Sequence, residues 1–202
     1  MQPPRALYCE FPLGRPLGTP GDETLQRNVL RAAFALLDAP IGPALADFPK
    51  VIALDDATPL ACSIPPRFDA SLHPAVDEST ALRAAYDRTR AARGGATSVG
   101  RTTNADGIPE LVGALVKIVE GTPWSEAGLP GDPVSAAHDL RSYYEEASIA
   151  LLDGDTPDPG GAEAWFYQET EAGKTLLEAR RKMGEAKAPF SLWFYMARAT
   201  RQ

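Results

Sequence analysis

The spacing of apolar residues along the chain predicts five helices joined by loops rich in proline and glycine. In the stretch 22–38, apolar side chains recur every three or four residues, with Asp22 as the N-cap and Pro40 just beyond the end. Four further helices are predicted at 77–93, 107–120, 133–153 and 160–187. The helix at 107–120 is apolar on nearly all sides, which is typical of a central helix. We therefore predict a mainly α protein, an orthogonal bundle of about five helices.

The N-terminal residues do not follow this helical pattern. Three prolines and three glycines fall between Leu7 and Asp22, which excludes a helix or a central strand. The same stretch carries apolar side chains that favour burial. We expect residues 1–21 to form an extended Pro/Gly-rich arm packed on a single helical domain, residues 22–202.

Residues 41–74 form the least regular region and are predicted to be a long irregular loop. The segment 44–48 can form one helical turn before Pro49. The short apolar run 51–54 reads either as a strand or as loop, and the sequence nearby offers no obvious pairing partner. A loop of this length within a compact domain usually has a function or covers another element.

Composition and charge narrow the classes of partner. Of the 202 residues 44% are hydrophobic, enough for a true core, and the net charge is −7. Nucleic acid and anionic membranes bind basic faces, whereas the basic clusters at 83–93 and 174–187 read as solvated helix faces. We expect neither nucleic acid nor membrane as a partner. Residues 1–5 do not resemble the start of a secretion signal, so we expect a cytoplasmic protein with reduced cysteines.

The two cysteines are candidate catalytic residues. A reactive thiolate needs a lowered pKa, and the acid Glu10 beside Cys9 has the wrong sign for that. Cys9 and Cys62 are therefore either inert, buried thiols or a redox pair, if their two extended segments meet. The histidines, His73 and His138, lack the spacing of a metal site, so no metal is predicted.

Candidate ligand-binding residues lie in loops that contain glycine. The polar loop 100–107 precedes the central helix, and a helix N-terminus with Arg101 and hydroxyl groups can hold an anion. Asn104 lies in the same loop, and Arg15 lies in the N-terminal arm. The alternative is that 100–107 is only a polar, capped connection, since the sequence has no nucleotide-binding motif.

Aromatic residues are concentrated in the last third of the chain. Most are expected in the core, but the segment 190–196 would be an exposed apolar patch if it were free. Trp193, Phe194 and Tyr195 are therefore either docked on the helices or part of an interface with a protein partner or a second copy.

Several motifs give the chain a family resemblance. They are the pattern Cys9-x-Phe-Pro-Leu-Gly-Arg-Pro-Leu-Gly18, Gly131-Asp-Pro133, Tyr143-Tyr-Glu-Glu-Ala147, Glu163-Ala-Trp-Phe-Tyr-x-Glu-Thr-Glu-Ala-Gly173 and Leu192-Trp-Phe-Tyr195. Over nearly its whole length the chain resembles a bacterial family of uncharacterised proteins. Its members are often encoded beside proteins resembling the selenoprotein B subunit of glycine, sarcosine, betaine and D-proline reductases. The family supplies no catalytic residues.

Two functions are compatible with the sequence. The resemblance implies an accessory or partner subunit of a thiol- or selenol-dependent reductase-like enzyme. The alternative is a stand-alone small-molecule enzyme or ligand-binding protein, with Cys9, Arg15 and Arg101 lining a site between the arm and the bundle. The sequence does not name a substrate or a cofactor, and a homo-oligomeric structural role is a third possibility.

Overall fold

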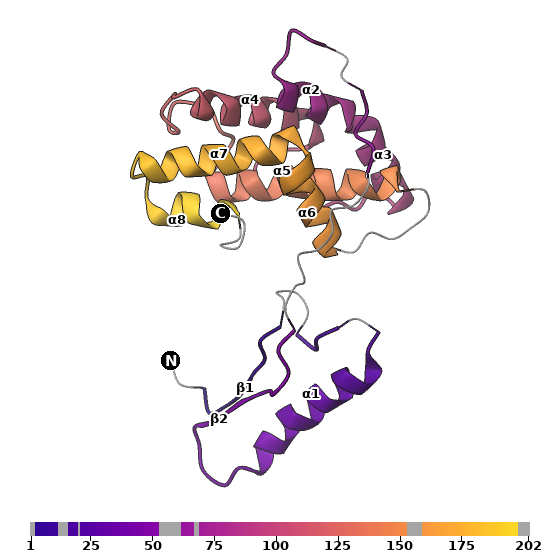
Figure 1. Ribbon diagram of the computed structural model, residues 1–202, viewed down its shortest axis with the longest axis vertical. Coiled ribbons are helices and arrows are strands. Elements are labelled where there is room, and N and C mark those ends of the chain that lie inside the picture. The colour runs from indigo at the N-terminus through magenta and orange to yellow at the C-terminus, as the bar shows by residue number, and fades with distance from the viewer. Residues whose placement is uncertain are drawn as a thin grey trace. The chain divides into compact units, whose positions relative to one another are not determined.

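The protein is mainly helical, as the sequence predicts, and divides into two units (Figure 1). The computed structural model describes residues 3–11, 16–19, 21–52, 62–66, 69–152 and 159–197. Unit 1 comprises Met1–Asp56 and unit 2 comprises Ala57–Gln202. The sequence places a boundary after residue 21 instead. The structure groups residues 22–56 with the N-terminal segment, because the first helix connects two paired strands. The packing of the arm on the helical domain stays a prediction.

Unit 1 is a small β–α–β unit. Strand β1 (Arg5–Tyr8) pairs in parallel with β2 (Ala44–Asp47), with Arg5 opposite Ala44, and helix α1 (Glu23–Ala35) lies between them in the chain. The predicted N-cap is confirmed, since the Asp22 carboxylate accepts a hydrogen bond from the backbone N–H of Leu25 at 2.9 Å. A two-stranded sheet is marginal alone and needs a helix against it.

Two expectations for residues 41–54 need comment. The helical turn predicted at 44–48 is wrong, because β2 occupies 44–47 and pairs with a strand some forty residues earlier in the sequence. Val51 and Ile52 are not a strand, although the Ile52 N–H donates to the Glu10 carbonyl at 3.0 Å. Residues 53–54 lie outside the described part of the chain.

Unit 2 is built around α4 (Ile108–Val119), the helix predicted to be central. It contacts α2 (Pro74–Ala81), α5 (Pro133–Leu151) and α7 (Glu171–Glu185). Helix α3 (Arg83–Ala92) packs along α5, and α6 (Pro159–Glu169) joins α5 to α7. The short α8 (Phe190–Trp193) and the 3₁₀ turn Phe194–Met196 pack on α5 and α7. None of the described helices is long and apolar enough to cross a membrane.

Two of the predicted helices are each a pair of helices. The helix predicted at 77–93 is wrong as one element, because α2 ends at Ala81 and α3 begins at Arg83. The helix predicted at 160–187 breaks at Thr170, whose hydroxyl accepts from the Gly173 N–H at 3.0 Å and so caps α7. Capping by a Thr side chain stabilises a new helix start at the expense of a continuous one.

A buried carboxylate fixes the start of α7. Glu78 on α2 accepts hydrogen bonds from the backbone N–H groups of Glu171 (2.9 Å) and Ala172 (3.2 Å) and from the Tyr144 hydroxyl (2.9 Å). Burial raises the pKa of Glu78. Because a negative charge at a helix N-terminus is favourable, this contact ties α2 and α5 to the beginning of α7.

Candidate functional site

The two cysteines lie in different units and are free thiols. Cys9 and Cys62 are both partly buried, and burial raises the pKa of each. A raised pKa lowers the thiolate fraction at neutral pH, which is the opposite of what a nucleophilic cysteine needs. Neither thiol therefore shows the electrostatics of an activated nucleophile.

The sequence predicts a ligand anion at the loop 100–107, whereas the anion that the backbone of 97–104 binds in the structure belongs to the protein itself. The Asp139 carboxylate on α5 accepts from the backbone N–H groups of Gly100 (3.1 Å), Arg101 (3.0 Å), Thr102 (2.7 Å) and Thr103 (3.2 Å). Burial by itself would raise the pKa of Asp139, but these bonds outweigh it and lower the pKa to about 2. The loop is therefore a structural device around a buried carboxylate.

A second buried acid anchors the same loop two helical turns further along α5. Glu146 accepts from the Ser98 N–H at 2.7 Å and from the Thr97 hydroxyl at 2.8 Å. Asn104 closes the loop by accepting from the N–H groups of Asp106 and Gly107. Its oxygen is thus used as a cap, which corresponds to the capped connection that the sequence offers as the alternative.

The structure describes only one of the two arginines that the sequence predicts to bind a ligand. Arg15 lies outside the described residues. The Arg101 side chain is exposed and makes no hydrogen bond or ion pair with a residue that the structure describes. Its charge lies near His138, whose pKa is lowered by burial and then by Arg101 and Arg141. Within the described ranges, no group of three His, Cys, Asp or Glu side chains could hold a metal ion.

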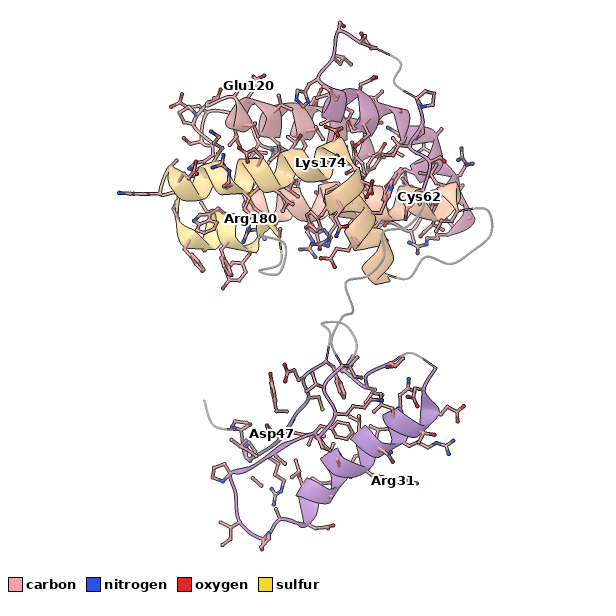
Figure 2. All side chains as sticks on the ribbon, viewed as in Figure 1. Arg31, Asp47, Cys62, Glu120, Lys174 and Arg180 are labelled. Atoms are coloured by element: carbon pink, nitrogen blue, oxygen red, sulfur yellow. The ribbon has the colours of Figure 1, made fainter. Side chains whose placement is uncertain are left out.

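The open cavity with the clearest chemistry lies between α7 and the C-terminal segment. This α7–α8 groove has a volume of about 690 Å³. Its lining combines cationic and apolar side chains with one acid: Lys174, Leu177, Glu178, Arg180, Arg181, Gly184, Trp193 and Phe194. Figure 2 shows Lys174 and Arg180 on α7, with Arg180 on the side that faces α8.

Arg180 is the unusual cation of this groove. Its side chain belongs to a residue only 6% exposed, and its guanidinium lies 5.6 Å from the ring centres of both Trp193 and Phe194. Nε and Nη2 both donate to the Phe194 carbonyl, at 3.3 Å. Among the described residues no carboxylate forms an ion pair with it. Burial accordingly lowers the pKa of Arg180.

The C-terminal aromatic residues form one contiguous cluster, which we call the C-terminal aromatic surface. The Phe190 and Phe194 rings stack with centres 4.4 Å apart, and Tyr195 packs edge-on against Phe194 at 5.3 Å. Phe190 is 55% exposed and Tyr195 62% exposed, whereas Trp193 and Phe194 are half-buried around Arg180. The segment is therefore docked on α7 through Trp193 and Phe194, while Phe190 and Tyr195 remain exposed. The other aromatics of the last third are core residues, as expected: Tyr143, Tyr144, Trp165, Phe166 and Tyr167.

The sequence assigns Arg180 to a solvated basic helix face, and that assignment is wrong. The sequence does contain a signal for the burial of Arg180. Leu177, Arg180 and Gly184 are spaced by three and four residues, so they share one side of a helix that precedes an aromatic segment. The indole packs over this glycine, where a Cβ at position 184 would lie 3.5 Å from the Trp193 ring, an ordinary van der Waals distance.

Comparison with known proteins gives no match, whether with protein-family models, with curated proteins or with solved structures.

Proposed function

We propose that this chain is an accessory subunit that binds a protein partner through its C-terminal aromatic surface. The partner we propose is a cytoplasmic thiol- or selenol-dependent reductase-like enzyme of the selenoprotein B type, which is the neighbour that the family resemblance suggests. The observation that carries the proposal is that Phe190 and Tyr195 are largely exposed while their rings pack against Phe194. Rigid, exposed aromatics are enriched at the centres of protein interfaces.

Unit 1 supports the same kind of role. Considered by itself, it leaves large apolar side chains exposed on and after α1, among them Phe34 (63%), Leu37 (65%) and Ile41 (80%). Exposed apolar groups in this number favour contact with another surface, in a partner or in a second copy of the chain.

The thiols argue for a supporting role rather than for catalysis by this chain. Burial raises the pKa of both Cys9 and Cys62, so neither is poised to attack a substrate at neutral pH. In the proposed complex the reactive sulfur or selenium belongs to the partner.

Co-expression with the neighbouring selenoprotein B-like protein tests this proposal. The tagged wild-type chain should co-purify that protein in a fixed ratio. The double variant Phe190→Ser, Tyr195→Ser should lose it without a change of melting temperature, because both side chains are largely exposed. The comparison variant Phe34→Ser, Leu37→Ser removes similar apolar area from unit 1 and should weaken co-purification less than the double variant does. If only the unit 1 variant lost the partner, the interface would lie on unit 1 instead. If the wild-type chain did not co-purify the neighbouring protein, the proposal would be refuted.

The second candidate is a stand-alone enzyme or ligand-binding protein. Here the Pro/Gly-rich arm packs across an orthogonal helical bundle, and Cys9, Arg15 and Arg101 line the site between them. The exposed Arg101 side chain, which has no partner among the described residues, favours it. Cys9→Ser should then abolish ligand binding or activity while the melting temperature stays nearly constant. A large loss of stability would instead assign Cys9 a packing role.

A further inference from the structure

Arg180 has a hydrogen-bonding edge that the described protein does not use. A guanidinium carries five N–H donors in one plane. The Nε–Nη2 edge is occupied by the Phe194 carbonyl, through two bonds of 3.3 Å. No described residue accepts from Nη1, so the Nη1–Nη2 edge, which can bind a carboxylate with two parallel bonds, is available.

A cation in this position is costly unless something compensates for it. The residue is 6% exposed, and the described structure supplies one carbonyl and two aromatic rings but no carboxylate. Burying a charge without an ionic partner destabilises a protein, whereas a ligand that brings the opposite charge recovers that loss. Among the described residues that line the groove the only acid is Glu178, which is already paired with Arg181.

Part of the described lining of the groove is apolar. Leu177, Trp193 and Phe194 line it beside Arg180, and its volume of about 690 Å³ lies within the range of small-molecule sites. Lys174 and Arg181 stand among its lining residues and make the surroundings of Arg180 cationic. A buried guanidinium with free N–H donors beside aromatic rings favours a ligand that has both a negative charge and a flat or compact apolar group.

We propose that the α7–α8 groove binds a small organic carboxylate with an aromatic or branched apolar body. The carboxylate takes the Nη1–Nη2 edge of Arg180, and the apolar body packs on Trp193 and Leu177. This inference goes beyond the proposed partner role and does not depend on it, because the binding involves this chain alone.

The first test compares a charged ligand with its neutral twin on the wild-type chain. Isothermal titration calorimetry with 3-phenylpropionate should show saturable binding. 3-Phenylpropionamide, which has the same shape without the charge, should bind at least about tenfold more weakly, because a charge-assisted bidentate contact is lost. Equal affinities of acid and amide, or no binding of the acid at millimolar concentration, would overturn the proposal.

The second test uses variants of the arginine. Arg180→Met keeps the length and loses the charge, and should reduce affinity for the acid by about tenfold or more without changing affinity for the amide. Arg180→Lys keeps the charge but not the fork and should give an intermediate value; it also serves if the Met variant fails to fold. Arg88→Gln, an exposed position on α3 outside the groove, is the control and should bind like wild type. Undiminished binding of the acid by a folded Arg180 variant contradicts the assignment. If the partner co-purifies but the acid does not bind, only this inference fails.

Discussion

Replacing Asp139 by Asn tests the most heavily bonded carboxylate of the structure. In the wild type, Oδ1 accepts from the N–H groups of Gly100 and Arg101, and Oδ2 accepts from the N–H groups of Thr102 and Thr103 and from the Thr102 hydroxyl. An Asn side chain has one oxygen only. Its NH₂ group must therefore face two or more backbone donors that then have no acceptor.

Two independent routes give the size of the effect. The pKa of Asp139 is lowered from 3.8 to about 2, and a shift of nearly two units corresponds to about 2 kcal/mol in favour of the folded state. Leaving two donors without an acceptor costs about 1–3 kcal/mol each. We expect Asp139→Asn to lower the free energy of unfolding by about 2–4 kcal/mol.

The pH dependence identifies the cause. A carboxyl whose folded-state pKa is lowered contributes stability above its unfolded pKa, and this contribution is lost as pH falls through the folded value. The difference in unfolding free energy between wild type and Asp139→Asn should thus be constant above about pH 5 and shrink towards pH 2.

Urea denaturation followed by tryptophan fluorescence measures this difference. All three tryptophans, Trp124, Trp165 and Trp193, belong to unit 2 and therefore report on its unfolding. Asp87→Asn is the matched control, since its exposed ion pair with Arg83 should contribute less than about 1 kcal/mol. A variant at 139 as stable as this control, or a difference that stays constant down to pH 2.5, would refute the reasoning.

Three further predictions concern packing, hydrogen bonding and thiol reactivity. Gly173→Ala should destabilise unit 2 by about 2–4 kcal/mol in the same urea assay, because its Cβ would lie 1.9 Å from the Phe166 carbonyl oxygen. Tyr144→Phe should cost about 1–2 kcal/mol, since it removes the buried hydroxyl that donates to Glu78. Both cysteines should react with iodoacetamide more slowly than free cysteine at pH 7.5, with rates that rise above pH 9, because burial raises their pKa.

Each of these predictions has a matched comparison. Gly113→Ala, within α4 and with open space around its Cβ, should be neutral or stabilising by up to about 1 kcal/mol. Tyr195→Phe should leave stability unchanged, since Tyr195 is exposed. If the two glycine variants lose equal stability, the contact with Phe166 is not the cause; if the two tyrosine variants do, the bond to Glu78 contributes nothing. Thiols that react faster than free cysteine would reverse the conclusion that they are not activated.

The helices that could be predicted from sequence are those with a local capping signal and a clear apolar stripe. Asp22 caps the first helix as predicted, Asp132 caps α5 at its predicted start, and the continuous apolar pattern of 107–120 correctly marks the central helix. These features depend on neighbouring residues only, so a single sequence contains them.

Features that depend on distant residues could not be predicted in this way. The strand at 44–47 exists because it pairs with residues 5–8, and tertiary pairing overrides local propensity. Helix α2 buries two acids, Asp77 and Glu78, which interrupt its apolar pattern. The apolar pattern of the sequence therefore does not show where α2 ends and α3 begins. The break before α7, by contrast, does have a local signal that the prediction of one continuous helix missed, since Thr170 caps α7 and Glu171 stands in its first turn.

The residues of the candidate site also differ in whether their environment could be predicted from local sequence. The sequence indicates an anion-binding loop at 100–107, and the backbone N–H groups do bind a carboxylate, but only the fold reveals that it is Asp139, more than thirty residues away. Arg180 reads as one of several basic residues on α7, and its burial follows from the docking of Trp193 and Phe194. Composition alone does not separate a solvated arginine from a buried one.

The central claim is that this chain assembles with a reductase-like partner, and light scattering after size exclusion tests it most directly. The purified chain and the proposed partner, a selenoprotein B-like protein, are mixed, and the molar mass is measured across the elution peak. Our account predicts one peak whose mass is that of a complex, which separates into two peaks with the Phe190→Ser, Tyr195→Ser variant. Two separate peaks with the wild-type chain, each with the mass of one protein alone, would contradict it.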